Sequence, residues 1–310
     1  MKKYLSLMRF DHWIKQLFIL PGILVALVLT KDLPSAQSIG LRTVAGFLSV
    51  CLVASSNYVI NEWLDAGSDR YHPVKKNRVA VTERLNPKAV CLFYVGSLLT
   101  GLLIALAVSR TFVFTMLWLW GMGVLYNVKP FRVKDIPYLD VFAESVNSAI
   151  RLLAGWFIVT DRFLPPVSAV LGYWFAGAFL MAAKRFAEYR MIHDPEAAGR
   201  YRRSFRTYSA RSLAILSFFC AMLSVFFIGV FLIKYRIELI LFMPFFIGLF
   251  CYYAHIACQE DSAAQRPEKL VREKGLLLYL LILAVVFAVT MTVDIPWLDQ
   301  LLSDVLIPIS

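Results

Sequence analysis

Long apolar runs constrain this chain more than any other feature of its sequence. Nine runs are each about as long as a tilted helix that crosses the hydrocarbon core of a membrane. Of the 310 residues, 59% are hydrophobic and only 17% are charged, which excludes an ordinary soluble domain. The sequence therefore predicts an all-α membrane protein, a polytopic bundle of nine transmembrane helices. The predicted spans lie near residues 14–30, 41–62, 88–108, 111–128, 138–160, 166–184, 212–233, 236–257 and 275–293.

The basic residues alternate between the loops of this bundle and predict its orientation. If the N-terminus and every second loop share one side, that side holds 25 of the 32 Lys and Arg residues. Because such residues gather on the cytoplasmic side, we expect the N-terminus inside and the C-terminus outside. This pattern also accounts for the net charge of +11 and does not indicate nucleic-acid binding. We expect a multi-pass protein of the plasma (inner) membrane whose active site faces the cytoplasm.

The rest of the composition indicates one domain without a soluble appendage. No long polar linker interrupts the chain, so residues 1–310 are predicted to form a single transmembrane domain. The five cysteines lie in or beside apolar runs and lack the spacing of a zinc or redox site. A homo-oligomer is compatible with this architecture and is left open. The catalytic loops are expected near residues 61–88, 126–140 and 184–211.

The stretch NEWLDAGSD places acids directly after an apolar run. Asn57, Asn61, Asp65 and Asp69 recur every four residues, which puts their side chains on one face of a helix. Amide and carboxylate oxygens suit a hard cation such as Mg²⁺, which usually binds one or two carboxylates together with a substrate's phosphates. The pattern predicts Asn61, Asp65 and Asp69 as metal ligands and catalytic residues. An acidic helix end without a metal is the alternative.

A basic stretch, DRYHPVKKNR, overlaps the end of these acids. Cations beside metal-binding acids make sense when both contact one highly charged anion, so the sequence predicts a bound diphosphate. His72, next to Pro73, is expected to cap the backbone or to face water, with metal binding as the alternative. The predicted substrate-binding residues of this stretch are Arg70, Lys75, Lys76 and Arg78. For each of them, positive-inside topology is the competing interpretation.

The acidic stretch resembles the signature of a known family. Asn61, Glu62, Asp65 and Asp69 align with the NDxxDxxxD motif of the UbiA superfamily of intramembrane prenyltransferases, except that Glu62 replaces an Asp. The resemblance extends over nearly the whole chain. It implies a nine-helix fold with a cytoplasmic N-terminus and a Mg²⁺-dependent transferase.

Four local features resemble one branch of that family, the decaprenyl-phosphate phosphoribosyltransferases. They are RFDHWIKQ, DRYHPVKKNR, YNVKPFRVKDIPYLDVF and KRFAEYR, although Val79 stands where we expect Pro. Lys184 and Arg185 replace the second acid-rich motif of members that alkylate aromatic acceptors. This pair cannot hold Mg²⁺ but can neutralise a phosphate. The resemblance thus implies substrate binding by Lys15, Tyr126, Lys129, Arg132, Lys134, Asp140, Lys184, Arg185 and Glu188.

The implied reaction is Mg²⁺-dependent transfer of 5-phosphoribosyl from phosphoribosyl pyrophosphate to a polyprenyl phosphate, with release of diphosphate. Its product would be a lipid-linked pentose precursor for cell-envelope glycans. The alternative is a polyprenyl diphosphate-dependent prenyltransferase with an aromatic acceptor, which would use the same metal site. A transporter of a phosphorylated solute is a third class, but the sequence shows no inverted repeat.

Arg151 lies inside the fifth predicted span, where a charge is costly and faces a cavity or a partner. We expect it to pair with Glu144 or to reach a substrate phosphate.

Overall fold

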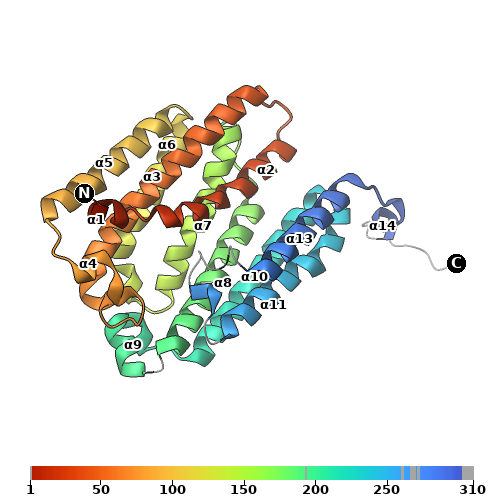
Figure 1. Cartoon of the computed structure of the whole chain (residues 1–310). Coiled ribbons are helices and arrows are strands. Elements are labelled where there is room, and N and C mark those ends of the chain that lie inside the picture. The colour runs from red at the N-terminus through yellow and green to blue at the C-terminus, as the bar shows by residue number, and fades with distance from the viewer. Residues whose placement is uncertain (1, 193, 260–261, 266–269, 271–272, 302–310) are drawn as a thin grey trace.

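In a computed structural model, the chain forms a bundle of long helices with shorter helices gathered at one end (Figure 1). The structure describes residues 2–192, 194–259, 262–265, 270 and 273–301. The long helices are α2 (Leu20–Leu29), which continues η1 (Phe10–Ile19), α3 (Ala36–Asp69), α5 (Pro87–Leu106), α6 (Arg110–Asn127), α7 (Leu139–Val159), α8 (Val167–Ile192), α10 (Ala210–Tyr235), α11 (Met243–Cys258) and α13 (Lys274–Thr292). The shorter elements are α1 (Lys2–Leu7), η2 (Lys75–Asn77), α4 (Val79–Thr82), η3 (Val133–Asp135), α9 (Pro195–Tyr201), η4 (Arg203–Arg206), η5 (Ile237–Phe242), η6 (Ala263–Gln265) and α14 (Pro296–Leu301).

Eight helical stretches of the described residues are long and apolar enough to cross a membrane. The all-helical fold is thus confirmed, and the protein is an integral membrane protein. The helix α6 forms where a ninth span is predicted, but it is not among the eight, and its ends carry the polar residues Arg110 and Asn127. The count of nine spans and the side of the N-terminus stay predictions.

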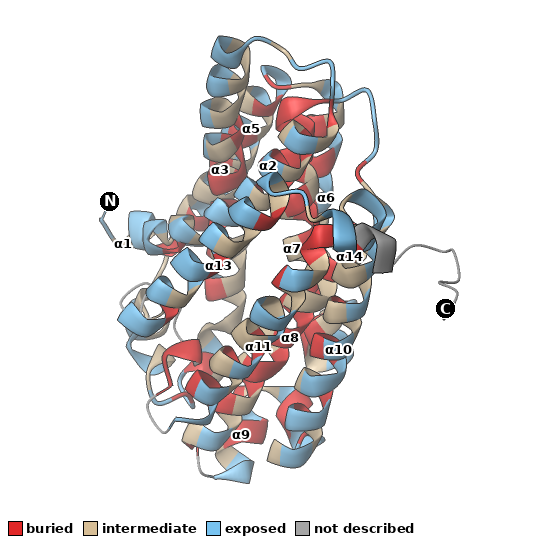
Figure 2. Cartoon of the chain, turned by 90° about the vertical axis from the view of Figure 1, so that its right-hand side faces the viewer, coloured by how far each residue is buried: buried red, intermediate tan, exposed pale blue. Residues whose placement is uncertain are grey.

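Burial follows the expected lipid-facing arrangement. In α7, 61% of the most apolar window is buried inside the molecule, whereas in α13 only 11% is buried. Figure 2 shows the same contrast between the central helices and the outer face of α13. Leu278, Leu281 and Val285 are exposed apolar residues of α13. Such a surface suits contact with lipid tails, which are as apolar as these side chains.

Glycines allow η1 and α2 to pack closely against α7. A Cβ atom at Gly155 would lie 2.0 Å from the carbonyl oxygen of Ile19, and one at Gly22 would lie equally close to the carbonyl of Leu152. Small residues permit this close approach of helices in a membrane. The contact places η1, which contains Lys15, beside the C-terminal half of α7.

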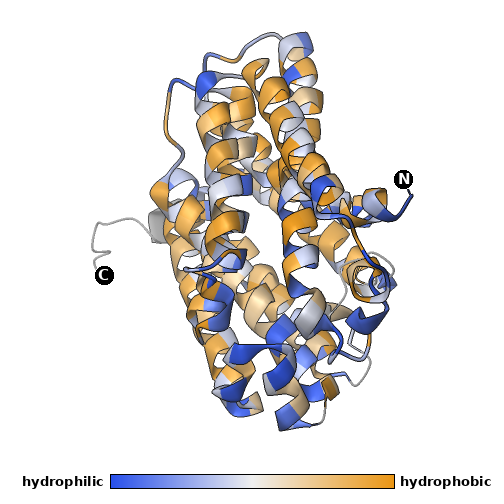
Figure 3. Ribbon diagram, turned by 90° about the vertical axis from the view of Figure 1, so that its left-hand side faces the viewer, coloured by the Kyte–Doolittle hydropathy of each residue, from blue (hydrophilic) through white to orange (hydrophobic). Residues whose placement is uncertain are grey.

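The length of α3 carries its acidic end out of the bundle core. Ser35 caps its N-terminus by accepting a hydrogen bond from the backbone N–H of Ser38. The helix has 34 residues and is therefore about 51 Å long, compared with about 30 Å for a hydrocarbon core. Asp65 and Asp69 occupy its last turns, at the end of the molecule where α9 lies (Figure 1) and where hydrophilic residues gather (Figure 3).

Candidate active site

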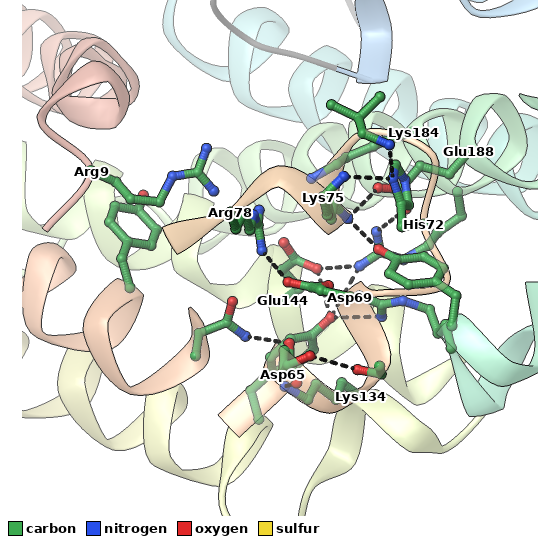
Figure 4. Close-up of a pocket in the computed structure, with 18 of the residues that line it drawn as sticks. Arg9, Asp65, Asp69, His72, Lys75, Arg78, Lys134, Glu144, Lys184 and Glu188 are labelled. Carbon is green, nitrogen blue, oxygen red and sulfur yellow. Dashed lines mark hydrogen bonds and ion pairs between the residues drawn. The ribbon is translucent and has the colours of Figure 1, made fainter. Parts of the chain in front are cut away.

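A cavity of about 330 Å³ lies at this polar end of the bundle. Its walls come from η1, α3, the loop that follows α3, α6, η3, α7, α8 and α9, and Figure 4 shows the side chains that project into it. Nine Lys and Arg residues and five Asp and Glu residues line it. The walls therefore carry an excess of positive charge, which favours an anionic ligand.

The acids of α3 are held by cations from two separate segments, the loop after α3 and the segment around η3. Asp65 accepts hydrogen bonds from Arg132 at 2.9 Å and from Lys134 at 2.5 Å. Asp69 accepts one from Arg78 at 2.7 Å. Burial lowers the pKa of the Lys134 ammonium to about 8, although the Asp65 carboxylate opposes this shift. The two carboxylates are thus neutralised by side chains that belong to other segments.

The donor set of α3 fits a magnesium ion shared with a substrate. The amide nitrogen of Asn61 donates to Asp65 and to Asn127, which leaves the amide oxygen of Asn61 available as a ligand. No group of three or more His, Cys, Asp or Glu side chains among the described residues could hold a metal by itself. Mg²⁺ commonly binds one or two carboxylates and completes its shell with waters and substrate phosphates. The two carboxylates and one amide present here match that habit.

Asn57 and Glu62 do not belong to this set. The Asn57 amide donates to the Leu119 carbonyl at 2.9 Å, and the absence of a side chain at Gly123 makes room for it. Asn57 therefore packs between α3 and α6, and of the four residues on that helix face only Asn61, Asp65 and Asp69 line the cavity. Glu62 is buried outside the cavity, beside the backbone of Ala80.

At the end of α8, the guanidinium of Arg185 is ion-paired with three carboxylates. Arg185 is 1% exposed, and its guanidinium lies 2.5 Å from Glu144 and 3.0 Å from Glu188. Asp140, which is fully buried, lies 3.3 Å from it. Tyr126 lines the cavity and joins this group, because its hydroxyl donates to Glu144 and accepts from Arg185. Each of these carboxylates already has a cationic partner.

Lys184 and Lys15 differ from Arg185. Both line the cavity, and neither is ion-paired with a carboxylate among the residues that the structure describes. Lys15 comes from η1 and lies 3.2 Å from His12 Nδ1. Lys184 has no hydrogen-bond partner in the described chain. These two ammonium groups are available to a ligand.

Lys75 links the loop after α3 to two helices at one side of the cavity. Lys75 donates to Glu188 at 2.8 Å and to the hydroxyl of Tyr201 in α9. Burial lowers the pKa of the Lys75 ammonium even though Glu188 lies beside it. The loop after α3 is thereby tied to both α8 and α9.

Four predicted substrate-binding residues lie outside the cavity. Arg70, Lys76 and Lys129 are exposed, because their backbone positions turn them toward solvent, and none of them lines the cavity. Asp140 lies beneath it and accepts hydrogen bonds from Arg202 and from Tyr208. Its place in the structure is that of a support for Arg185 and the segment after α9. The predicted residues that the fold does bring together are Lys15, Asn61, Asp65, Asp69, Lys75, Arg78, Tyr126, Arg132, Lys134, Lys184, Arg185 and Glu188.

Several lining residues were not predicted to bind substrate. Arg9 precedes η1 and His12 lies in it, with Lys15 three residues further on, and this spacing matches one turn of a 3₁₀ helix. That regular spacing is a signal that the sequence contained. The others are Tyr58, Ser68, His72, Val74, Asn77, Asp135, Glu144, Tyr201 and Arg202.

The structure corrects the expectations for Arg151 and refines that for His72. Arg151 donates to Gln16 at 2.8 Å and to the Asn147 carbonyl, and it does not line the cavity, so the expected pairing with Glu144 is wrong. His72 does cap the backbone, but it is buried instead of facing water.

Comparison with known proteins gives the chain a family. The model of the UbiA prenyltransferase family matches residues 19–281. A UbiA homologue from Archaeoglobus fulgidus, solved bound to DMAPP and Mg²⁺, is similar with a TM-score of 0.68 at 22% identity, and the match covers 94% of this chain and 100% of that one. At this identity the likeness shows the fold.

Two curated relatives are similar over part of their length. A decaprenyl-phosphate phosphoribosyltransferase of Mycolicibacterium smegmatis is 25% identical over 213 residues, which are 65% of this chain and 61% of that protein. The nodulation protein NoeC of Azorhizobium caulinodans is 28% identical over 211 residues, which are 65% of this chain and 62% of that protein. The chain thus spans less than two thirds of the length of these relatives.

Proposed function

Because this chain belongs to the UbiA prenyltransferase family, we propose that the cavity is the active site of a Mg²⁺-dependent polyprenyl-phosphate phosphoribosyltransferase. The enzyme transfers 5-phosphoribosyl from phosphoribosyl pyrophosphate to a polyprenyl phosphate and releases diphosphate. In this proposal residues 1–310 act as one catalytic domain in the plasma membrane, and the cavity faces the cytoplasm. The product is a lipid-linked pentose for later use in cell-envelope glycans.

The observation that carries this proposal is the surplus of cations in the cavity. Arg132, Lys134 and Arg78 are ion-paired with the two acids of α3. Lys15 and Lys184 also line the cavity but lack a carboxylate partner in the described chain. Two phosphate-bearing reactants repel each other unless cations lie between them. With a neutral aromatic acceptor, the diphosphate of the donor would be the one substrate anion for all of these cations. The similarity to named phosphoribosyltransferases supports the same choice.

The residues of α3 act on the leaving group. Asn61, Asp65 and Asp69 would hold the Mg²⁺, which supplies neutralisation of the charge that develops on departing diphosphate. With the carboxylates engaged in this way, Arg132 and Lys134 can direct their N–H groups at phosphate oxygens. Charge-assisted hydrogen bonds of this kind also hold the donor in place.

The reaction needs positioning more than proton transfer. The bond between ribose C1 and the diphosphate oxygen breaks, and a bond forms between C1 and an oxygen of the lipid phosphate. A phosphate dianion is already a nucleophile, so no general base is required. Lys15 and Lys184 hold the lipid phosphate against the repulsion of the donor, while the polyprenyl chain lies among the apolar helices.

A direct assay tests this function. Purified protein in detergent is given radiolabelled phosphoribosyl pyrophosphate, Mg²⁺ and a short polyprenyl phosphate, and the organic phase is counted. We expect acid-labile label in the lipid fraction. A parallel reaction contains a prenyl diphosphate and an aromatic acceptor, since the solved relatives bind DMAPP or GPP. Product only in that second reaction would replace phosphoribosyl transfer by aromatic prenylation.

A further inference from the structure

His72 is a buried side chain of the cavity wall that neither the acid motif nor the cation pattern explains. It lies in the loop after α3, three residues beyond Asp69, and is 3% exposed (Figure 4). Its ring packs edge-on against Tyr201 of α9 with centroids 4.6 Å apart. The imidazole is therefore fixed between two segments that close the cavity.

The hydrogen bonds of His72 determine which ring nitrogen carries the proton. Nδ1 accepts from the backbone N–H of Val74 at 3.1 Å and of Lys75 at 3.2 Å, so Nδ1 must present a lone pair. An imidazole that accepts hydrogen bonds at Nδ1 is neutral and has one remaining N–H group. The single ring proton therefore resides on Nε2.

This Nε2–H group has no acceptor within the described chain. The nitrogen is buried and makes no hydrogen bond among the residues that the structure describes. The oxygens of Glu188, a nearby acid, are already used by Lys75 and Arg185. A buried donor without an acceptor is unfavourable, and such groups in native proteins usually have a reason. At the wall of a cavity, the natural acceptor is a ligand oxygen.

We infer that the Nε2–H of His72 donates a hydrogen bond to a phosphoryl oxygen of the sugar-phosphate donor. This inference rests on the proposed function. The donor is favoured over the lipid because His72 lies beyond the last turn of α3, next to Asp69 and under α9, whereas a lipid phosphate arrives along the membrane helices. A neutral donor whose ring is fixed at Nδ1 gives the ligand one defined orientation.

Two substitutions separate ligand binding from backbone capping. In His72→Asn, the amide oxygen can still accept the bonds that cap the turn, but nothing replaces Nε2–H. In His72→Gln, the amide nitrogen reaches the position of Nε2, but the cap is lost. His255→Asn, at an exposed position of α11, is the matched control. Thermal melting of each full-length variant in detergent verifies folding.

Binding is measured by calorimetry with Mg²⁺ and three probes: phosphoribosyl pyrophosphate, inorganic diphosphate and ribose 5-phosphate. We expect His72→Asn to weaken binding of phosphoribosyl pyrophosphate about 10-fold, and His72→Gln to stay within about 3-fold of the unmodified protein. A parallel loss for diphosphate places the contact on the leaving group, and a loss for ribose 5-phosphate places it on the 5-phosphate. If His72→Asn does not fold, retained binding by His72→Gln supports the contact and lost binding by folded His72→Gln overturns it.

Two other outcomes reject the inference in distinguishable ways. If the unmodified protein binds the probes and His72→Asn binds them equally well, His72 is only a cap and the proposed function stands. If the unmodified protein binds none of the probes, the inference fails together with the proposed function.

Discussion

The ends of α3 and α8 both bring acids and cations to one cavity, but they do so in different ways. At the end of α3, the partners of Asp65 and Asp69 come from loops and short helices, and Asp65 keeps 13% of its side chain exposed. At the end of α8, Arg185 is paired with carboxylates on α7 and α8 themselves. Loop partners can exchange for a metal or a phosphate, whereas partners on packed helices can part only if the helices move. We infer that the acids of α3 bind ligands and that Arg185 stabilises the fold.

The largest expected effect is on stability, from Arg185→Gln. This change leaves Asp140 and Glu188 buried with less compensating charge, and removing one partner of a buried ion pair typically costs about 3–5 kcal/mol. We expect a clearly lower melting temperature in detergent. Arg190→Gln, at an exposed position of the same helix, is the control and should melt normally. If both variants had the same melting temperature, Arg185 would have no structural role.

Asp65→Asn should show the opposite profile, with activity lost and folding kept. The change removes anionic charge at the proposed metal site while an amide of the same shape remains, so we expect about a 100-fold or greater loss of turnover. Asp69→Asn should lose turnover to a similar extent. The assay is label transfer at saturating Mg²⁺, with Asp161→Asn, exposed in the loop before α8, as the control. Near-normal turnover by both cavity variants would mean that these acids do not bind the metal.

A smaller effect is expected from Lys184→Gln, which tests the neighbour of Arg185 on the same helix. Lys184 has no partner to lose within the described chain, so its replacement should leave melting unchanged. It should raise KM for the lipid phosphate about 10-fold, and Lys184→Arg should raise it less. Steady-state kinetics with both substrates varied give the answer. An unchanged KM would mean that Lys184 does not bind the lipid phosphate and only follows the positive-inside distribution of charge.

The smallest effects are expected from the exposed cations outside the cavity. Single changes of Arg70, Lys76 or Lys129 to Gln should alter kcat/KM less than about 2-fold, because none of these residues lines the cavity and exposed charges are screened by salt. Any variant in this set that raised KM about 10-fold would show that the substrate extends beyond the cavity.

Local pattern was sufficient for much of the site. The four-residue repeat placed Asn61, Asp65 and Asp69 on one face, and the structure has all three lining the cavity. The same repeat included Asn57, which instead bonds to α6. Periodicity along one helix cannot distinguish these two outcomes, because only the neighbouring helix decides which turns of that face are covered.

Pairing between distant segments was not predictable in the same way. Arg151 and Glu144 lie two turns apart on α7, yet Glu144 is bound by Arg185 of α8 and Arg151 by Gln16 of η1. The contact of η1 with α7 depends on Gly155, whose missing side chain makes room for the Ile19 backbone. Which side chains pair depends on how closely the helices approach each other, and the sequence of one helix does not determine that distance.

By itself, the sequence determined the membrane location, the helical architecture, the family and the acids at the end of α3. Each of these depends on composition or on spacing within one segment, where the period of a helix and the cost of burying charge are decisive. Only the tertiary structure decided which charges neutralise one another and which remain available. Lys134 lies 69 residues from Asp65. The turn that fixes His72 leaves its Nε2 without an acceptor in the described chain, in the wall of a cavity that eight segments build. Electrostatic pairing depends on distance in space, and the fold alone sets that distance.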